Sequence, residues 1–158
     1  MIRIEFLNKT EAMATLLRLF DILYDNMHLV APTGKDYYAD RQEFLDAVGP
    51  ALEKEPRQIL LLYADDHLAG FCQYYIHKGI FMVEELQVKR EYQATTLFVC
   101  LYRFLRKLIP DDTHYIEAWA DLRNSRSRRL MEKLGMQPVE LLEQRSLIHY
   151  RGDITKLQ

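Results

Sequence analysis

Polar and apolar positions follow a clear period along most of this chain. Residues 2–7 alternate as in a half-buried strand, and Asn8 with Glu11 resembles a capping box that starts a helix. The apolar positions of that helix recur at helical spacing and share one face: Leu16, Phe20, Leu23 and Met27. The chain is therefore expected to begin with a strand followed by an amphipathic helix.

The next segments predict a second helix and a hairpin. Asp40 with Glu43 repeats the helix-start signal, and Gly49-Pro50 is expected to interrupt this second helix. Residues 58–64 and 68–77 are expected to form strands that a turn joins. Nearer the C-terminus, residues 114–120 and 144–151 are further predicted strands.

A strand, a turn and a helix are predicted over residues 81–108. The run FMVEELQV, residues 81–88, has strand character, and the leucines that follow it recur at helical spacing until Pro110: Leu97, Leu101, Leu105 and Leu108. Backbone N–H groups at a helix start have no intrahelical acceptor and meet the positive end of the helix dipole. The turn before this helix could therefore hold a phosphate or a nucleotide-like cofactor.

This turn resembles the signature of the GNAT family of N-acetyltransferases: Gln or Arg, two residues, Gly, one residue, then Gly or Ala. The corresponding window is Gln93-Ala94-Thr95-Thr96-Leu97-Phe98, in which Gln93 matches and both Thr96 and Phe98 depart from the pattern. A Cβ at Thr96 narrows the approach of a phosphate. The hydroxyls of Thr95 and Thr96 could donate to phosphate oxygens instead, or they could simply cap the helix.

A second segment supports the resemblance. Residues 124–136, NSRSRRLMEKLGM, are similar to a late GNAT segment that runs Asn, two residues, Ser or Ala, then Tyr before Lys-Leu-Gly-Phe. Asn124 is a predicted N-cap and Gly135 a predicted C-terminal cap, whereas Met131 occupies the position of the family's tyrosine. The basic residues around this helix could face a cofactor phosphate or form a solvated surface.

The resemblance covers nearly the whole chain and implies one domain over residues 1–158 with an α/β (α+β) fold. Its sheet is expected to be mixed, mostly antiparallel and flanked by helices. It also implies an acetyl-CoA-dependent N-acetyltransferase, in which an amine attacks the thioester directly in a ternary complex. The positions implied to bind acetyl-CoA are Leu86, Gln87, Val88, Gln93, Ala94, Thr95, Thr96, Leu97, Phe98 and Asn124.

Two carboxylates are candidates for the base that deprotonates the amine, either directly or through a water. Glu84 and Glu85 are neighbours in a strand, and strand alternation is expected to turn them to opposite faces of the sheet. A carboxylate with a raised pKa can act as such a base. We favour Glu85 as the base and expect Glu84 to form an ion pair or to lie at a strand edge.

In this fold the acceptor is usually selected by the region between the first two helices, here residues 28–39. Asp36, Tyr37 and Tyr38 lie in that region, and aromatic faces beside a carboxylate attract cations. The same tyrosines could equally pack as part of a lid. The sequence does not name the acceptor, which could be a small molecule or a protein amino group.

Composition excludes several other functions. The 158 residues carry a net charge of -2, which argues against a general nucleic-acid binder. Cys72 and Cys100 lie among apolar neighbours, the five histidines are scattered, and no metal-ligand spacing occurs, so no metal is expected. No signal peptide or membrane span is evident, and we expect a cytoplasmic protein.

Other functional classes remain open beside the enzyme. A GNAT-fold binding or regulatory module without turnover is favoured by Ala94, Thr96, Phe98 and Met131, whereas the strand EELQV, Gln93 and Asn124 favour the enzyme. A homodimer formed through exposed edge strands of the C-terminal half is a weaker third interpretation.

Overall fold

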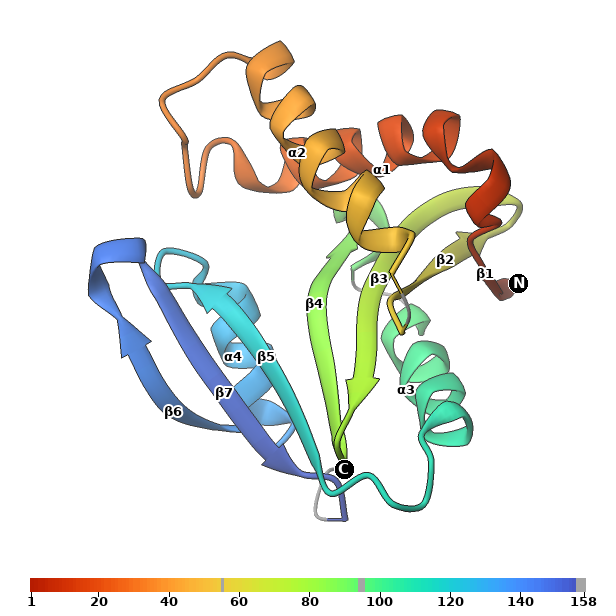
Figure 1. Ribbon diagram of the computed structural model, residues 1–158, viewed down its shortest axis with the longest axis vertical. Helices are drawn as coiled ribbons and strands as arrows, with labels where there is room; N and C mark the ends of the chain where they lie inside the picture. Colours follow the sequence, from red (N-terminus) through yellow and green to blue (C-terminus); the bar gives the residue numbers. More distant parts are fainter. Residues whose placement is uncertain (55, 94–95, 156–158) are drawn as a thin grey trace.

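The computed structural model describes residues 1–54, 56–93 and 96–155 (Figure 1). Its centre is a sheet of seven strands in the order β1-β2-β3-β4-β5-β7-β6. The strands are β1 Ile2–Phe6, β2 Gln58–Ala64, β3 His67–His77, β4 Ile80–Val88, β5 Tyr115–Asp121, β6 Gln137–Leu142 and β7 Leu147–Asp153. The helices are α1 Ala12–Met27, α2 Tyr37–Leu52, α3 Leu97–Leu108 and α4 Ser125–Lys133.

The sheet is mixed and mostly antiparallel, which confirms the predicted fold class. Strands β4 and β5 run parallel, and the other described pairs are antiparallel. The α3 helix lies in the connection between β4 and β5, as a parallel pair requires. Helices α1 and α2 pack on one face of the sheet, and α3 and α4 on the other (Figure 1).

Two apolar clusters make up the larger part of the core. On the α1/α2 face, Leu19 and Phe71 are fully buried, and on the α3 face Leu60 and Leu97 are fully buried. Cys72 belongs to the α3 cluster, and burial raises the pKa of its thiol to about 12. This thiol is inert at neutral pH, in agreement with a packing role.

The chain before α1 agrees only in part with its prediction, and the start of α2 does not agree. Asn8 is the N-cap of a 3-10 turn, Lys9–Glu11, which leads into α1 at Ala12. Its side chain accepts from the Thr10 amide at 3.1 Å, and the Glu11 side chain lies outside the described part of the structure. Helix α2 starts at Tyr37, because Asp36 accepts from the Ala39 amide at 2.8 Å. The predicted start signal at Asp40 and Glu43 is therefore wrong.

The predicted interruption at Gly49-Pro50 is also wrong, because α2 continues through both residues to Leu52. Pro50 lies in the last turn, where its missing N–H removes one hydrogen bond close to the helix end. Val48 and Leu52 on either side are buried, at 8% and 4% exposure. Packing of these side chains holds the final turn in place.

The C-terminal end of the chain forms a hairpin that the sequence predicted only in part. Strand β7 begins at Leu147, later than the predicted start at residue 144, because Glu143–Arg145 form a 3-10 turn and Ser146 is left-handed with φ 55°. Strand β6 was missed, since five of its six residues are exposed and the alternation of Val139 and Leu141 is too short to mark a strand.

No helix in the described ranges is both long and apolar enough to cross a membrane. Within those same residues, no group of three or more His, Cys, Asp or Glu side chains is arranged to hold a metal ion.

Candidate active site

The candidate site lies where β4 and β5 separate. Their parallel pairing runs from Ile80 opposite Tyr115 to Val83 opposite Ala118, and beyond that point the two strands move apart (Figure 1). We call residues 84–88 of β4 and 119–121 of β5 the divergent segments. Along its divergent segment, β4 pairs with β3 on one edge and has no described strand partner on the other.

A bulge in β4 turns Glu84 and Glu85 to the same face of the sheet. The pairing with β3 shifts between Gln73 opposite Glu85 and Tyr74 opposite Val83, so Glu84 is the extra residue. The apolar positions confirm the shift, because four β4 side chains all pack in the α3 cluster: Phe81, Val83, Leu86 and Val88. The prediction of opposite faces is wrong, because strict alternation does not survive a bulge.

Glu84 is neutralised by an arginine. Arg57 donates to both carboxylate oxygens, from Nε at 2.7 Å and from Nη2 at 3.0 Å, and Gln73 donates from 3.4 Å. The bidentate geometry makes this a strong, partly buried pair. The structure thus confirms the expected ion pair of Glu84.

Glu85 has no basic partner among the described residues and takes part in a chain of amides instead. Gln87 Nε2 donates to Glu85 Oε1 at 2.6 Å, and Asn26 Nδ2 of α1 donates to Gln87 Oε1 at 3.0 Å. Burial raises the pKa of the Glu85 carboxyl, and the negative charge of Glu84 adds to the rise, whereas the Gln87 hydrogen bond lowers it. A raised pKa makes a carboxylate a better proton acceptor.

Side-chain amides fix the end of β4. The Val88 carbonyl accepts from Asn26 Nδ2 and from Gln93 Nε2, both at 2.8 Å. Gln93, the residue that matches the family signature, therefore folds back on the strand, and its buried Oε1 has no described partner. Leu86 packs in the α3 cluster, so only its backbone is available at the strand edge.

The start of α3 carries the positions that depart from the family signature. Thr96 is the N-cap residue, but its side chain makes no capping hydrogen bond and is exposed. Leu97 is fully buried and Phe98 is partly buried in the same apolar cluster, so the benzyl group packs inward. Ala94 and Thr95 lie outside the described residues.

Asn124 links the start of α4 to the end of α1. Its Oδ1 accepts from the Ser127 amide at 3.1 Å, as predicted for an N-cap, and its Nδ2 lies 3.4 Å from Met27 Sδ. Met131 packs against the apolar cluster of β5 and β7. Of the basic residues near this helix, Arg123 pairs with Asp121 at 2.9 Å.

The candidate acceptor residues belong to the packing between α1 and α2. Asp36 caps α2, and Tyr37 donates to Asp21 and meets the Phe20 ring at 5.3 Å. Tyr38 is 68% exposed and lies under the Arg41 guanidinium at 5.1 Å. These contacts fit a packed lid, and the described bonds do not join these residues to β4.

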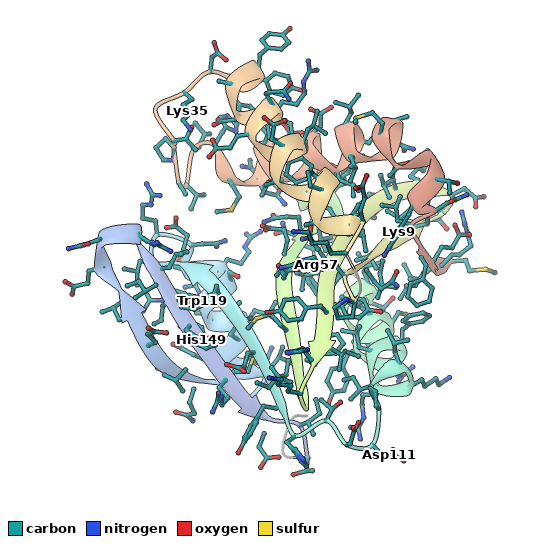
Figure 2. The ribbon with its side chains drawn as sticks, viewed as in Figure 1. Lys9, Lys35, Arg57, Asp111, Trp119 and His149 are labelled. Carbon is teal, nitrogen blue, oxygen red and sulfur yellow. The ribbon has the colours of Figure 1, made fainter. Side chains whose placement is uncertain are left out.

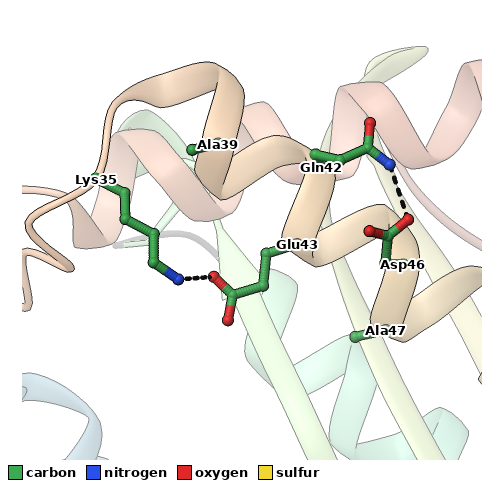
Figure 3. Close-up of a pocket in the computed structure, with 6 residues that line it drawn as sticks. All are labelled: Lys35, Ala39, Gln42, Glu43, Asp46 and Ala47. Atoms are coloured by element: carbon green, nitrogen blue, oxygen red, sulfur yellow. Dashed lines mark hydrogen bonds and ion pairs between the residues drawn. The ribbon is translucent and has the colours of Figure 1, made fainter.

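A shallow depression on α2 is lined by none of these three residues (Figure 3). Its lining comes from α2 and the loop before it: Lys35, Ala39, Gln42, Glu43, Asp46 and Ala47. Lys35 pairs with Glu43 at 2.6 Å, and Gln42 donates to Asp46 at 2.8 Å. Because its polar side chains are paired and no β4 residue lines it, we leave it out of the candidate site.

Asn26 and Arg57 complete the site and were missed in the sequence. Both lie far from β4 along the chain, and only the folded sheet brings them to Gln87 and Glu84. Sequence signals for them are weak, because an Asn at a helix end and an Arg before a strand are ordinary. The divergent segment of β5 adds Trp119, whose strand YIEAWAD carried a stronger signal in its polar and aromatic alternation.

Comparison with solved structures identifies the fold. The structure aligns with PaiA N-acetyltransferase of Thermoplasma acidophilum, solved with coenzyme A, at TM-score 0.73 and 14% identity over 97% of this chain and 99% of that one. It also aligns with a Chromobacterium violaceum protein assigned to the GNAT family of acetyltransferases, at TM-score 0.67 and 17% identity over 98% and 88% of the two chains. This chain has the GNAT fold.

A further match is the Campylobacter jejuni N-acetyltransferase PseH, solved with acetyl coenzyme A, at TM-score 0.63 and 12% identity over 96% and 99% of the two chains. No protein-family model and no curated protein matches the sequence. The GNAT fold is thus shown by three-dimensional structure, in agreement with the resemblance seen in the two sequence segments.

Proposed function

We propose that this protein is an acetyl-CoA-dependent N-acetyltransferase that transfers an acetyl group to an amine by direct attack. One observation carries the proposal: β4 and β5 separate beyond Val83 and Ala118, directly beside the partly buried carboxyl of Glu85. A backbone edge for the cosubstrate and a base for the acceptor amine are therefore adjacent.

The cosubstrate would lie along the open edge of the β4 divergent segment. Main-chain groups there can bind an extended amide-containing arm as an added strand does, whatever the side chains are. The Val88 carbonyl is already occupied by Asn26 and Gln93, so these contacts fall on the residues before it. The first-turn amides of α3 supply donors for a pyrophosphate, and Phe98 packs away from them.

In the reaction, the nitrogen lone pair of the amine attacks the thioester carbonyl, and the C–S bond breaks as the new C–N bond forms. Glu85 takes the amine proton, directly or through one water. The sulfur leaves as a thiolate, and Met131 has no proton to give it. A thiol of pKa ~8.5 is acidic enough for solvent to supply that proton.

Matched variants of the adjacent carboxylates test this proposal. We expect Glu85→Gln to lower kcat about 100-fold or more with little change in acetyl-CoA affinity, because the variant cannot accept the proton. Glu84→Gln, which lies on the same sheet face, breaks the Arg57 pair and is expected to affect stability more than turnover. Release of the CoA thiol, followed with a thiol reagent over a panel of primary amines, measures both. Equal losses of kcat in the two variants would contradict the role of Glu85 as the base.

The alternative is a GNAT-fold module that binds a ligand without turnover, and Met131 favours it, since a thioether stands within an apolar cluster where the family has a tyrosine. Acetyl-CoA binding without thiol release across the amine panel would support this alternative.

A further inference from the structure

The face of β5 and β7 opposite α4 carries polar and aromatic side chains that the proposed reaction does not use. Trp119 and His149 are cross-strand partners, with ring centroids 4.4 Å apart and ring planes 12° from parallel. Figure 2 labels both residues next to each other over these strands. The centroid separation is close to the ~4.8 Å spacing of neighbouring strands, so the rings stack across the strands.

A buried carboxylate lies beside His149, without a hydrogen bond from the His149 Nε2. Glu117 Oε1 lies 2.7 Å from His149 Nε2 and 3.4 Å from Arg151 Nη2, and the Glu117 side chain is 4% exposed. On the other side of the ring, His149 Nδ1 lies 3.7 Å from Glu140 Oε2. The imidazole lies against one face of the indole.

The opposite face of the Trp119 indole is turned toward β4. Because His149 covers the β7 side, and the strand order is β4-β5-β7, the other face points across the divergent segments. In the described part of the chain, no second ring or cation is stacked on it. Trp119 as a whole is only partly buried.

Trp119 lies on the same side of the sheet as Glu85. Met82 pairs with Glu117, and the side chains next to Met82 on either side pack in the α3 cluster, so Met82 and Glu117 face away from α3. Trp119 follows Glu117 by two residues and shares its face. Glu85 also faces away from α3 because of the bulge. The indole and the carboxyl thus flank the divergent segments from opposite strands.

The sheet face that carries Trp119 and Glu85 has an excess of negative charge. Arg57 neutralises Glu84 and Arg151 faces Glu117, whereas Glu85 and Glu140 have no lysine or arginine partner in the described ranges. An aromatic face beside an unpaired carboxylate attracts an organic cation. Anionic acceptors are repelled by this arrangement, and neutral amines gain neither the ion pair nor the cation–π contact from it.

We propose that Trp119 and Glu85 form the recognition site for the acceptor, which is a cationic aliphatic amine held as its ammonium between the indole and the carboxylate. That the bound cation is the acetyl acceptor rests on the proposed function, whereas the binding of a cation at this site does not. Trp119 determines specificity, while Glu117 and His149 are positioning residues that hold the indole in place.

The test uses the fact that Trp119 is the single tryptophan of the chain, so tryptophan emission reports this residue alone. We expect choline chloride, whose quaternary nitrogen cannot be acetylated, to change the emission saturably at millimolar concentration. Its neutral isostere 3,3-dimethyl-1-butanol is expected to have little effect at matched ionic strength. Equal responses to the two probes, or no saturable response to choline, would overturn the proposal.

Variants and calorimetry locate the site. Trp119→Leu is expected to weaken choline binding on the order of 3- to 30-fold, whereas Trp119→Phe keeps an aromatic face and loses less. Phe6→Leu removes an exposed ring of β1, the edge strand far from β5, and serves as the matched control with unchanged binding. An equal loss in the Phe6 variant would also contradict the assignment.

The acetyl-CoA melting shift separates the two proposals. A shift with acetyl-CoA but none of the choline selectivity would overturn the cation site and leave the transferase standing. Choline selectivity without any acetyl-CoA binding would support the cation site and contradict the transferase.

Discussion

The two halves of the sheet differ in how they are covered. Strands β2 and β3 contribute to buried apolar clusters on both faces, one under α1 and α2 and one under α3, and β1 and β4 contribute to the α3 cluster. The cluster of β5 and β7 lies on the α4 face alone, and their opposite face carries Glu117, Trp119 and His149. The first half is a rigid frame, and the second presents polar and aromatic groups beside it. The candidate site lies at the boundary, where the two halves lose their pairing.

The largest effect is expected from breaking the frame at Gly70. A Cβ there would lie 2.4 Å from the Gln87 carbonyl oxygen and 3.0 Å from Val88 Cα, both backbone atoms that cannot move aside. We expect Gly70→Ala to lower the free energy of unfolding by about 3 kcal/mol, measured by urea denaturation. It should also disturb the divergent segment of β4 and with it acetyl-CoA binding.

Gly49→Ala is the matched control. An added Cβ at Gly49 meets nothing within 4 Å, and the residue lies inside α2. Alanine is favoured over glycine in helices, so the free energy of unfolding of this variant should rise by roughly 0.5–1 kcal/mol. Similar losses in both variants would show that the contact of Gly70 with β4 is not the cause.

A smaller effect is expected in the second half of the sheet from Glu117→Gln. The amide cannot serve as the charged partner of His149 and Arg151, and we expect a loss of about 1–3 kcal/mol in the free energy of unfolding. Glu140→Gln, at a 52% exposed side chain, should change it by less than about 0.5 kcal/mol. If the two variants were equally stable, the buried Glu117 carboxylate and its neighbours His149 and Arg151 would contribute nothing to stability.

The smallest effect concerns the pH dependence of stability at Glu85. Its carboxyl pKa is raised above 4.5, so the folded state favours the protonated form, and the stability from this group is lost as pH rises through the folded pKa. Glu85→Gln removes that titration and keeps an acceptor for Gln87. The melting temperature of the variant should equal that of the native protein below about pH 4.5 and exceed it increasingly toward pH 8. A constant difference across this range would contradict the assignment.

Much of the fold could be predicted from the sequence, because the period of apolar residues depends only on which face is buried. The helix of Leu97 to Leu108 and the strand ending at Val88 agree with their patterns. Strand β6 could not be predicted, since only Val139 and Leu141 alternate in it and the strand is mostly exposed. The α2 start was misplaced because Asp40 with Glu43 carries the pattern of a helix start, whereas the folded chain uses Asp36 as the cap.

The candidate site was less predictable, because its geometry depends on pairing between distant segments. The sequence identified Glu84 and Glu85 and the expected ion pair of Glu84. Their shared face could not be seen, since a bulge is set by register with β3 rather than by β4 itself. The roles of Asn26 and Arg57 likewise arise only when α1 and the start of β2 meet β4.

Melting temperature as a function of acetyl-CoA concentration tests the central claim most directly. A ligand that binds only the folded state stabilises it by about 2.7 kcal/mol at a hundredfold excess over Kd, which shifts the melting temperature of a domain of this size by several degrees. We expect a saturable rise in the melting temperature. Most of this rise should remain in Glu85→Gln, because the Glu85 carboxyl acts on the acceptor amine and not on acetyl-CoA. No rise at millimolar acetyl-CoA would contradict the assignment of the divergent segments as the cosubstrate site.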